Sequence, residues 1–232
     1  MTVRVVDIET TGVDPSSDAV IEIACAELTK AGKLVNTFDT LIACGQPIEP
    51  EASAAHHIIA EDLEGAPPIE EVIGKLTGAD AYVAHNATFE RSFLERWLGN
   101  DAPWVCTYRC ALRVWPDLPS HSNQALRYRL GLVEPFGTPR AELKAHRALS
   151  DAIVTGAIFL KLTKAAKWRD LVQWSYEPPL HTICRLPKHK GKRYEQIANE
   201  DPSYLDWIIN KSDLDEATKF SAQHWLEFYA RG

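Results

Sequence analysis

Near its start the chain reads Val3-Arg4-Val5-Val6-Asp7-Ile8-Glu9-Thr10-Thr11-Gly12. This short run of β-branched residues, ended by Thr-Thr-Gly, predicts a buried strand that runs into a turn. Side chains alternate along a strand, so Asp7 and Glu9 share one face while Val6 and Ile8 lie on the other. Two neighbouring carboxylates repel each other and lose hydration when buried. A hard divalent cation would stabilise them; the alternative is a solvated pair at a sheet edge.

The composition indicates one globular domain with a small appendage. The chain has 232 residues, of which 45% are hydrophobic and 25% charged, as is usual for such a protein. No apolar run approaches the roughly 18 residues of a membrane span, and no targeting segment is visible. We therefore expect a cytoplasmic protein without membrane association. Five cysteines without a Cys-x-x-Cys pair favour buried thiols over a zinc site at Cys106 and Cys110.

The net charge of −7 is unevenly distributed along the chain. Residues 1–104 carry a balance of −12, residues 105–150 carry +4 and residues 151–232 carry +1. An acidic first part suits a carboxylate metal site, and a basic middle suits contact with phosphates. An ordinary fluctuation of charge would give the same balance.

The order of the expected elements indicates an α/β domain. Strands come first, and later strands alternate with helices, which favours a mixed sheet flanked by helices. After the first strand, the expected strands are residues 20–28, 33–42, 81–84 and 105–107, the first two forming an antiparallel meander with it. The expected helices are residues 52–57, 69–76, 86–97, 111–115, 123–130, 144–162, 168–176, 203–210 and 214–228.

Two later stretches carry acidic and imidazole side chains, His85-Asn86-Ala87-Thr88-Phe89-Glu90 and Ala145-His146-Arg147-Ala148-Leu149-Ser150-Asp151-Ala152. Glu90 falls in the first turn of a helix capped by Asn86, where the helix dipole favours negative charge. Five helical positions rotate by about 500°, so His146 and Asp151 would not share a helix face. We therefore expect His146 in the connection before the helix and Asp151 in its early turns. Surface or capping chemistry is the alternative for each residue.

The three acidic stretches resemble, in order, the three motifs of the DEDDh 3′–5′ exonucleases. They are Asp7-Ile8-Glu9-Thr10-Thr11-Gly12, His85-Asn86-Ala87-Thr88-Phe89-Glu90 and His146-Arg147-Ala148-Leu149-Ser150-Asp151-Ala152. Pro50-Glu51-Ala52-Ser53-Ala54-Ala55-His56-His57-Ile58 fits the Pro-Ile-His-Gly-Ile-type connection of the same family, with His57 where glycine is usual. The resemblance covers about residues 1–165, and three ordered motifs make it specific.

The resemblance implies a ribonuclease H-like exonuclease fold, a mixed sheet flanked by helices, and a two-metal phosphodiesterase. Asp7, Glu9 and Asp151, with help from Glu90, would hold two Mg²⁺ or Mn²⁺ ions per site. His146 would act as the general base. The implied partner is DNA with a 3′ end, single-stranded or duplex, shortened by release of 5′-mononucleotides in repair or end-processing. The residues expected to contact it beside the motifs are Thr10, Gly12, Val13, His85, Asn86 and Phe89.

Further stretches are similar to a bacterial exodeoxyribonuclease branch of that family. They are residues 105–107, 112–116 and 122–126, and, in a small C-terminal module, residues 186–192 and 201–207. We expect an exonuclease domain at 1–166, a linker at 167–179 broken by Pro178-Pro179, and a small basic α+β module at 180–232. Its basic turn presents Lys188, Lys190 and Lys192, which would bind phosphates or remain a solvated loop.

Two departures from the family pattern bear on function. Glu90 stands where aspartate is usual. Its extra methylene moves the carboxylate by roughly one carbon–carbon bond, and site geometry is sensitive to displacements of about 1 Å. Leu186-Pro187 replaces the usual Phe-Gly of the module. Two alternatives remain open on the sequence: an RNA-directed or polymerase-proofreading exonuclease of this family, and a non-catalytic relative that only binds nucleic acid.

Overall fold

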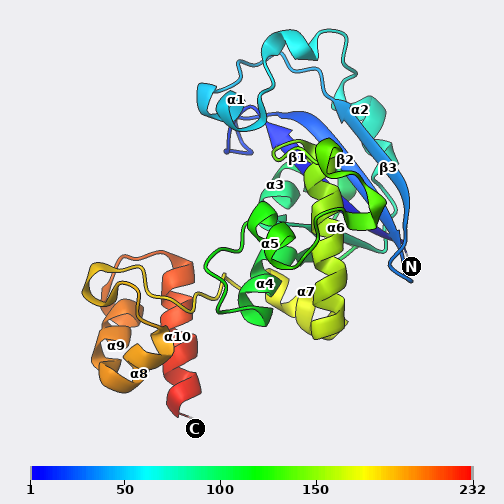
Figure 1. Cartoon of the computed structure of the whole chain (residues 1–232). Helices are drawn as coiled ribbons and strands as arrows, with labels where there is room; N and C mark the ends of the chain where they lie inside the picture. Colours follow the sequence, from blue (N-terminus) through cyan, green and yellow to red (C-terminus); the bar gives the residue numbers. More distant parts are fainter. Residues whose placement is uncertain (1, 231–232) are drawn as a thin grey trace.

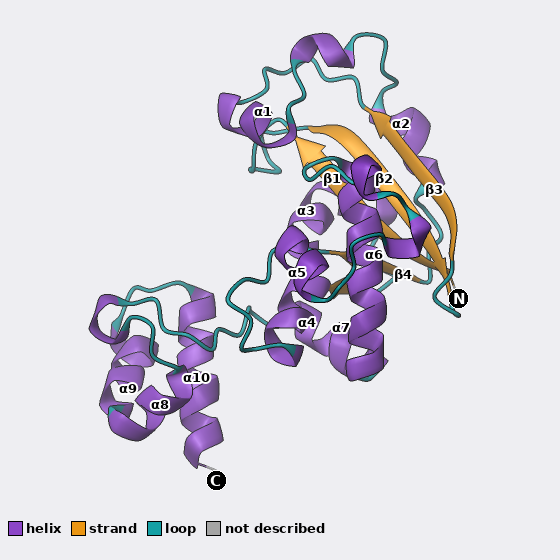
Figure 2. Cartoon of the chain, viewed as in Figure 1, coloured by secondary structure: helices purple, strands orange, loops and turns teal. Residues whose placement is uncertain are grey.

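The computed structural model describes residues 2–230 and contains one five-stranded sheet with the order β3-β2-β1-β4-β5. β1 (Thr2–Thr10), β2 (Val20–Thr29) and β3 (Leu34–Leu41) form an antiparallel meander. β4 (Ala81–Ala84) and β5 (Trp104–Cys106) extend the sheet in parallel beyond β1. The mixed sheet and the central position of β1 confirm the expected α/β architecture (Figures 1 and 2).

Helices cover both faces of the sheet because β1 is apolar on both sides. Val3 and Val5 pack into one buried cluster and Val6 and Ile8 into another. The first cluster receives residues of α4 (Thr107–Val114), α5 (Asn123–Arg129), α6 (Ala148–Ala165) and α7 (Trp168–Tyr176). The second receives α2 (Ile69–Val72) and α3 (Ala87–Leu98). Asp7 and Glu9, which alternate in step with Val3 and Val5, therefore point to the side of α6.

The connection from β3 to β4 contains α1 (Pro50–His56) and two 3₁₀ turns, Ala60–Leu63 and Ile73–Lys75. Further 3₁₀ turns are Pro135–Gly137, Arg140–Glu142 and Pro187–His189. The expected helix at 144–162 was wrong at its start, because α6 begins only at Ala148. The backbone of His146 has φ of 58° and interrupts any helix there. The short helix α8 (Tyr194–Glu200) was not predicted.

The C-terminal module is helical in the part that the structure describes. α8, α9 (Pro202–Lys211) and α10 (Glu216–Ala230) pack around their own small buried cluster, which includes Tyr194, Leu205 and Ile208. The β content expected from the sequence is limited there to one isolated bridge between Ile183 and Arg193. Figure 1 shows this module set to one side of the sheet domain and joined to it by an extended segment.

α7 occupies the segment expected to be a linker, but it packs into the domain core. Leu171 is fully buried in the cluster beneath the sheet. The hydroxyl of Ser175 accepts a hydrogen bond of 2.7 Å from the backbone N–H of Cys106 in β5. α7 therefore holds the edge of the sheet, while the division of the chain at residues 166 and 179 stays a prediction.

The structure also bears on the membrane and zinc expectations. Among residues 2–230 no helix has the length and apolar character needed to cross a membrane. All five cysteines are free thiols, and Cys106 and Cys110 are buried. Within the described residues, neither belongs to a group of three or more side chains that could hold a metal ion. The buried-thiol interpretation of these cysteines therefore fits the structure.

Candidate active site

Three carboxylates meet where β1 ends against the first turn of α6. One oxygen each from Asp7, Glu9 and Asp151 lies within 4.8 Å of the others, and this is the single group of its kind among the described residues. Asp7 and Glu9 come from one face of β1 by strand alternation. Asp151 is brought to them by the crossing of α6 over β1, although it is more than 140 positions away in the sequence. The sequence predicted this group, and the packing of α6 assembles it.

The pKa values of the three carboxyl groups are all raised, which shows that the cluster carries uncompensated negative charge. Burial, together with the charges of Asp151 and Glu90, raises the pKa of Asp7 well above its usual range. Burial, followed by the repulsion of Asp151, raises the pKa of Glu9 to about 8. Burial also raises the pKa of Asp151. Each carboxylate therefore favours a proton or a cation beside it, and oxygen ligands suit hard divalent ions such as Mg²⁺.

Glu90 lies beside the cluster in the first turn of α3. Its side chain is only 5% exposed, and its Oε2 atom is buried without a hydrogen-bond partner within the described residues. Burial, with the charge of Glu9, raises the pKa of Glu90 to about 8. A buried carboxylate oxygen with no donor is costly unless a proton or cation faces it. This oxygen is an independent sign that the residues here fit a divalent ion.

His146 stands in the connection before α6, as expected from the helical-rotation argument. Its backbone N–H donates a 2.8 Å hydrogen bond to Oδ2 of Asp151, while its side chain is exposed. The other carboxylate oxygen of Asp151 accepts a 2.6 Å hydrogen bond from the side-chain amide of Gln124. Asp151 is thus held from two sides, and the imidazole of His146 remains free to face a bound molecule.

Glu22 in β2 is a site residue that the sequence reasoning missed. It pairs with Glu9 across the strands and is almost completely buried. Its carboxylate accepts hydrogen bonds from the guanidinium of Arg147, the shortest at 2.5 Å, and from the backbone N–H of Ala148 at 3.0 Å. These bonds fix the start of α6 against the sheet. A glutamate between two isoleucines of β2, Ile21 and Ile23, was the available signal.

A groove of about 550 Å³ opens directly beside Glu9. It is lined by the first motif and the loop after it, by α1 and by the start of α3, including Thr10, Gly12, Val13, His56 and Phe89. Val13 is 83% exposed, which is unusual for valine and suits a surface that a ligand covers. The groove has the size of a small-ligand site. Four of the expected substrate-contacting residues, Thr10, Gly12, Val13 and Phe89, therefore come together.

The loop after β1 explains the glycine of the first motif. Asp18 receives hydrogen bonds from the backbone N–H of Asp14 at 2.8 Å and from the hydroxyl of Thr11 at 3.3 Å. A side-chain carbon added at Gly12 would lie 2.5 Å from the Asp18 carboxylate, far inside van der Waals contact. Any side chain at Gly12 would therefore displace the Asp18 carboxylate from its hydrogen bonds with Asp14 and Thr11.

His56 supports the same loop from α1. The backbone N–H of Ile58 donates to Nδ1 of His56, so Nε2 carries the proton and donates to the carbonyl of Thr10 at 3.3 Å. Burial lowers the pKa of His56 and keeps it neutral. His57 follows with φ of 61°, the left-handed conformation that glycine adopts most easily. The left-handed backbone explains why glycine is usual in the family at the position that His57 occupies here.

The remaining expected substrate contacts lie outside the groove. His85 donates from Nε2 to the carbonyl of His121 at 2.9 Å and bonds the Thr107 hydroxyl through Nδ1 at 2.9 Å. Burial lowers the pKa of His85 to about 4, so both ring nitrogens serve the protein interior. Asn86 is exposed at the start of α3, but its side chain makes no capping hydrogen bond there, contrary to expectation.

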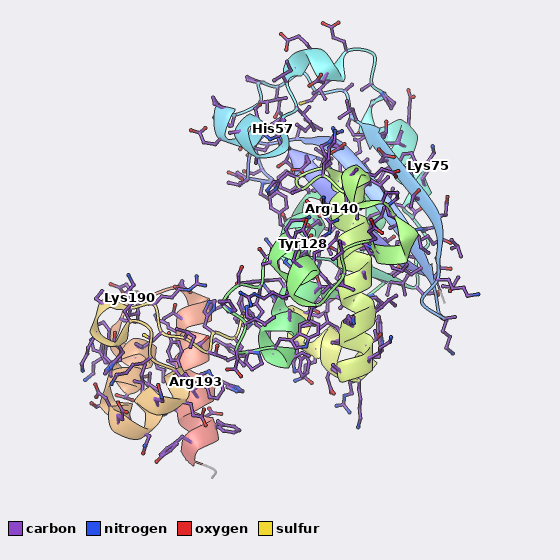
Figure 3. The ribbon with its side chains drawn as sticks, viewed as in Figure 1. His57, Lys75, Tyr128, Arg140, Lys190 and Arg193 are labelled. Carbon is purple, nitrogen blue, oxygen red and sulfur yellow. The ribbon has the colours of Figure 1, made fainter. Side chains whose placement is uncertain are left out.

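The lysines of the basic turn are on the separate module. Figure 3 shows Lys190 there, far across the view from His57 near α1. Lys188 forms an ion pair of 2.6 Å with Asp201, and Lys192 one of 2.7 Å with Glu200. The module's own acidic side chains therefore neutralise two of the three lysines, which does not support their assignment as phosphate contacts.

Comparison with known proteins fits this arrangement. The sequence model of the RNase_T family, described as exonuclease, matches residues 5–159. Exodeoxyribonuclease 10 of Escherichia coli K12 is 33% identical over 229 residues, covering 97% of this chain and 98% of that protein. PolC-type DNA polymerase III of Thermotoga maritima is 31% identical over 237 residues, which is 91% of this chain but 17% of the polymerase.

Solved structures agree. Exonuclease X in complex with 5′ overhanging duplex DNA is 32% identical with a TM-score of 0.63, and the match covers 75% of this chain and 99% of that one. Exonuclease I, at 16% identity and a TM-score of 0.57, matches 75% of this chain and 42% of its own; this likeness shows the fold alone. The ordered acidic motifs, the fold and the end-to-end relative lead to one conclusion: the chain belongs to the RNase_T exonuclease family.

Proposed function

We propose that this exonuclease removes nucleotides from the 3′ ends of DNA and releases 5′-mononucleotides, with Mg²⁺ or Mn²⁺ as its cofactor. The observation that carries the proposal is the carboxylate cluster of Asp7, Glu9 and Asp151, which is half-buried, mutually repulsive and placed beside an open groove. Support for DNA as the substrate comes from two relatives. The E. coli protein that matches over nearly its whole length is named an exodeoxyribonuclease, and the similar structure of exonuclease X is a complex with duplex DNA.

The carboxylates, the imidazole and the apolar side chains of the site have different roles in the proposed reaction. Asp7, Glu9 and Asp151 would hold two metal ions, and the unpartnered oxygen of Glu90 would add negative charge beside them. When bound, such ions lower the pKa of water and stabilise charge on the leaving oxygen. The imidazole of His146 accepts the proton of the attacking water at a ring nitrogen. Val13 and Phe89 pack against the terminal nucleotide and exclude water from one side of it.

The test is the degradation of a 5′-labelled DNA oligonucleotide. With Mg²⁺ the label should appear in products shortened one nucleotide at a time from the 3′ end, and EDTA should stop the reaction. Asp7→Asn and Asp151→Asn should abolish shortening, because each removes a ligand charge. Mn²⁺ titration should give two bound ions per parent chain and fewer in either variant.

Asp206→Asn, which changes an exposed aspartate on α9, is the matched control and should cleave at the parent rate. A parent-like rate in Asp7→Asn or Asp151→Asn would refute the metal assignment. A matched RNA oligonucleotide distinguishes the substrate classes, because its sugars carry the 2′-hydroxyl that DNA lacks. Faster degradation of the RNA would overturn the choice of DNA.

A further inference from the structure

A second, larger groove separates the nuclease domain from the C-terminal module. Its volume is about 870 Å³, at the upper end of the range for small-ligand sites. One wall is formed by residues 108–122 of the nuclease domain and the other by residues 181–193 of the module. The two walls are tied together by the hydroxyl of Thr182, which donates to the carbonyl of Pro116 at 2.9 Å, and by an ion pair between Arg193 and Asp117.

The charges that line this groove are positive on balance. Two guanidinium groups, those of Arg185 and Arg193, line it together with a single carboxylate, that of Asp117. Asp117 forms an ion pair with Arg193, so its carboxylate does not neutralise Arg185. Arg185 is exposed and makes no hydrogen bond or ion pair with any described residue. One guanidinium thus faces the open groove without a counterion from the protein.

Two imidazoles stand close to this guanidinium. Burial, and then the charge of Arg185, lowers the pKa of His181, and both effects also lower the pKa of His121. His121 donates from Nε2 to the carbonyl of Trp115 at 2.8 Å. The backbone of His181 is fixed by bonds to Ser221 and Trp225. Burial and Arg185 thus disfavour a positive charge on either imidazole, and an anion that enters the groove meets Arg185.

One edge of the groove lies close to the residues that hold Asp151. Ser122 lines it and caps α5, and two residues later Gln124 holds the carboxylate of Asp151 at 2.6 Å. Tyr108, another lining residue, donates its backbone N–H to the carbonyl of His85 at 3.0 Å. A DNA strand whose 3′ end lies at Asp151 would reach this groove by running along the start of α5 toward the module.

We propose that the groove between the nuclease domain and the module binds the phosphodiester backbone of the DNA strand behind its 3′ end, with Arg185 as the phosphate contact. This inference rests on the proposed function, because it assumes a DNA strand at the carboxylates. The proposed binding surface of the module is the face turned toward the nuclease domain. It is not the lysine turn, where Lys188 and Lys192 form ion pairs with Asp201 and Glu200. Guanidinium and phosphate form charge-assisted hydrogen bonds, so the contact is independent of base sequence.

The test measures affinity for a DNA strand long enough to reach the module, in EDTA so that it is not cut, at several salt concentrations. Arg185→Gln should weaken binding roughly tenfold and reduce the salt slope by about one, because one fewer counterion is released. Arg185→Lys, which keeps the charge, should retain the parent slope. Degradation of a DNA trinucleotide in Mg²⁺, which ends before the groove, should be unchanged in both variants.

Arg169→Gln is the matched control, since Arg169 is an exposed arginine in the first turn of α7 that does not line the groove. It should bind the long strand with parent affinity. If Arg185→Gln also binds with parent affinity and parent salt slope, the groove does not hold the strand. If the parent protein leaves even the trinucleotide intact in Mg²⁺, the proposed function itself has failed, which is a separate outcome.

Discussion

His146 combines a strained backbone with an exposed ring. A non-glycine residue with φ of 58° costs about 1–2 kcal/mol, and the hydrogen bond from its N–H to Asp151 offsets part of that cost. The strained conformation ends the loop before α6 and leaves the imidazole outside the helix, next to the carboxylate that it would assist. Asparagine tolerates the same conformation, so it can replace the imidazole without disturbing the backbone.

His146→Asn should therefore lower kcat by about 10²–10⁴-fold, the usual contribution of a general base, while affinity for DNA in EDTA stays close to that of the parent. His57→Asn is the control, because His57 is also exposed and left-handed, with φ of 61°, but has no place among the carboxylates. It should keep the parent kcat. A His146→Asn variant that turns over normally and binds weakly would make His146 a phosphate contact instead of a base.

The position of the start of α6 against the sheet depends on a residue of β2. The buried Glu22 carboxylate holds Arg147 and the first N–H of α6, so it fixes both His146 and Asp151 relative to β1. Residues that orient metal ligands typically affect metal affinity or activity by about 10–100-fold. Glu22 acts through α6 and touches no substrate, which makes it a positioning residue.

Glu22→Gln should raise the Mg²⁺ concentration for half-maximal rate by about tenfold, because an amide cannot accept from all the donors that face the carboxylate. Excess Mg²⁺ should restore most of the rate. Glu27→Gln provides the comparison on the same strand, where Glu27 pairs with Arg4 at 3.6 Å away from the site. Identical Mg²⁺ dependence in the two variants would show that Glu22 has no positioning role.

The acidic cluster makes the stability of the folded protein depend on pH and on bound metal. The folded-state pKa values of Glu9 and Glu90 are raised to about 8 from 4.5. Between these values the folded protein binds more protons than the unfolded chain, so stability falls as pH rises. Below about pH 4.5 this cost is absent, and above about pH 8 it is fully present. A bound divalent cation replaces the protons and adds its own binding free energy to stability.

In EDTA, Tm should therefore fall between pH 5 and pH 8, by about 2–4 °C for each kcal/mol lost in a protein of this size. Mg²⁺ should raise Tm most at pH 8. Glu90→Gln, which keeps the shape but removes a titrating charge, should have a shallower pH dependence in EDTA than the parent. Thermal unfolding of parent and variant at matched pH measures the difference. A parent and a variant with the same slope would show that Glu90 does not contribute to the linkage.

The sequence alone determined the local elements and the chemistry that they carry. Strand alternation put Asp7 and Glu9 on one face of β1, and helical rotation required His146 to precede the helix that bears Asp151. These inferences succeeded because period, handedness and turn propensity are properties of neighbouring residues. The order of three short acidic motifs then sufficed to indicate the family that the comparisons established.

Tertiary structure alone decided which distant groups meet. Glu22 and Arg147 are separated by 125 positions, and the residues adjacent to each in the sequence do not predict that the two side chains pair. The basic turn carried three lysines in the sequence, yet folding placed two of them on acidic partners and left Arg185 open to the groove. The sequence specifies which side chains are charged. Whether such a side chain can bind a ligand depends on its ion-pair partners and its burial, and both are set only when the chain folds.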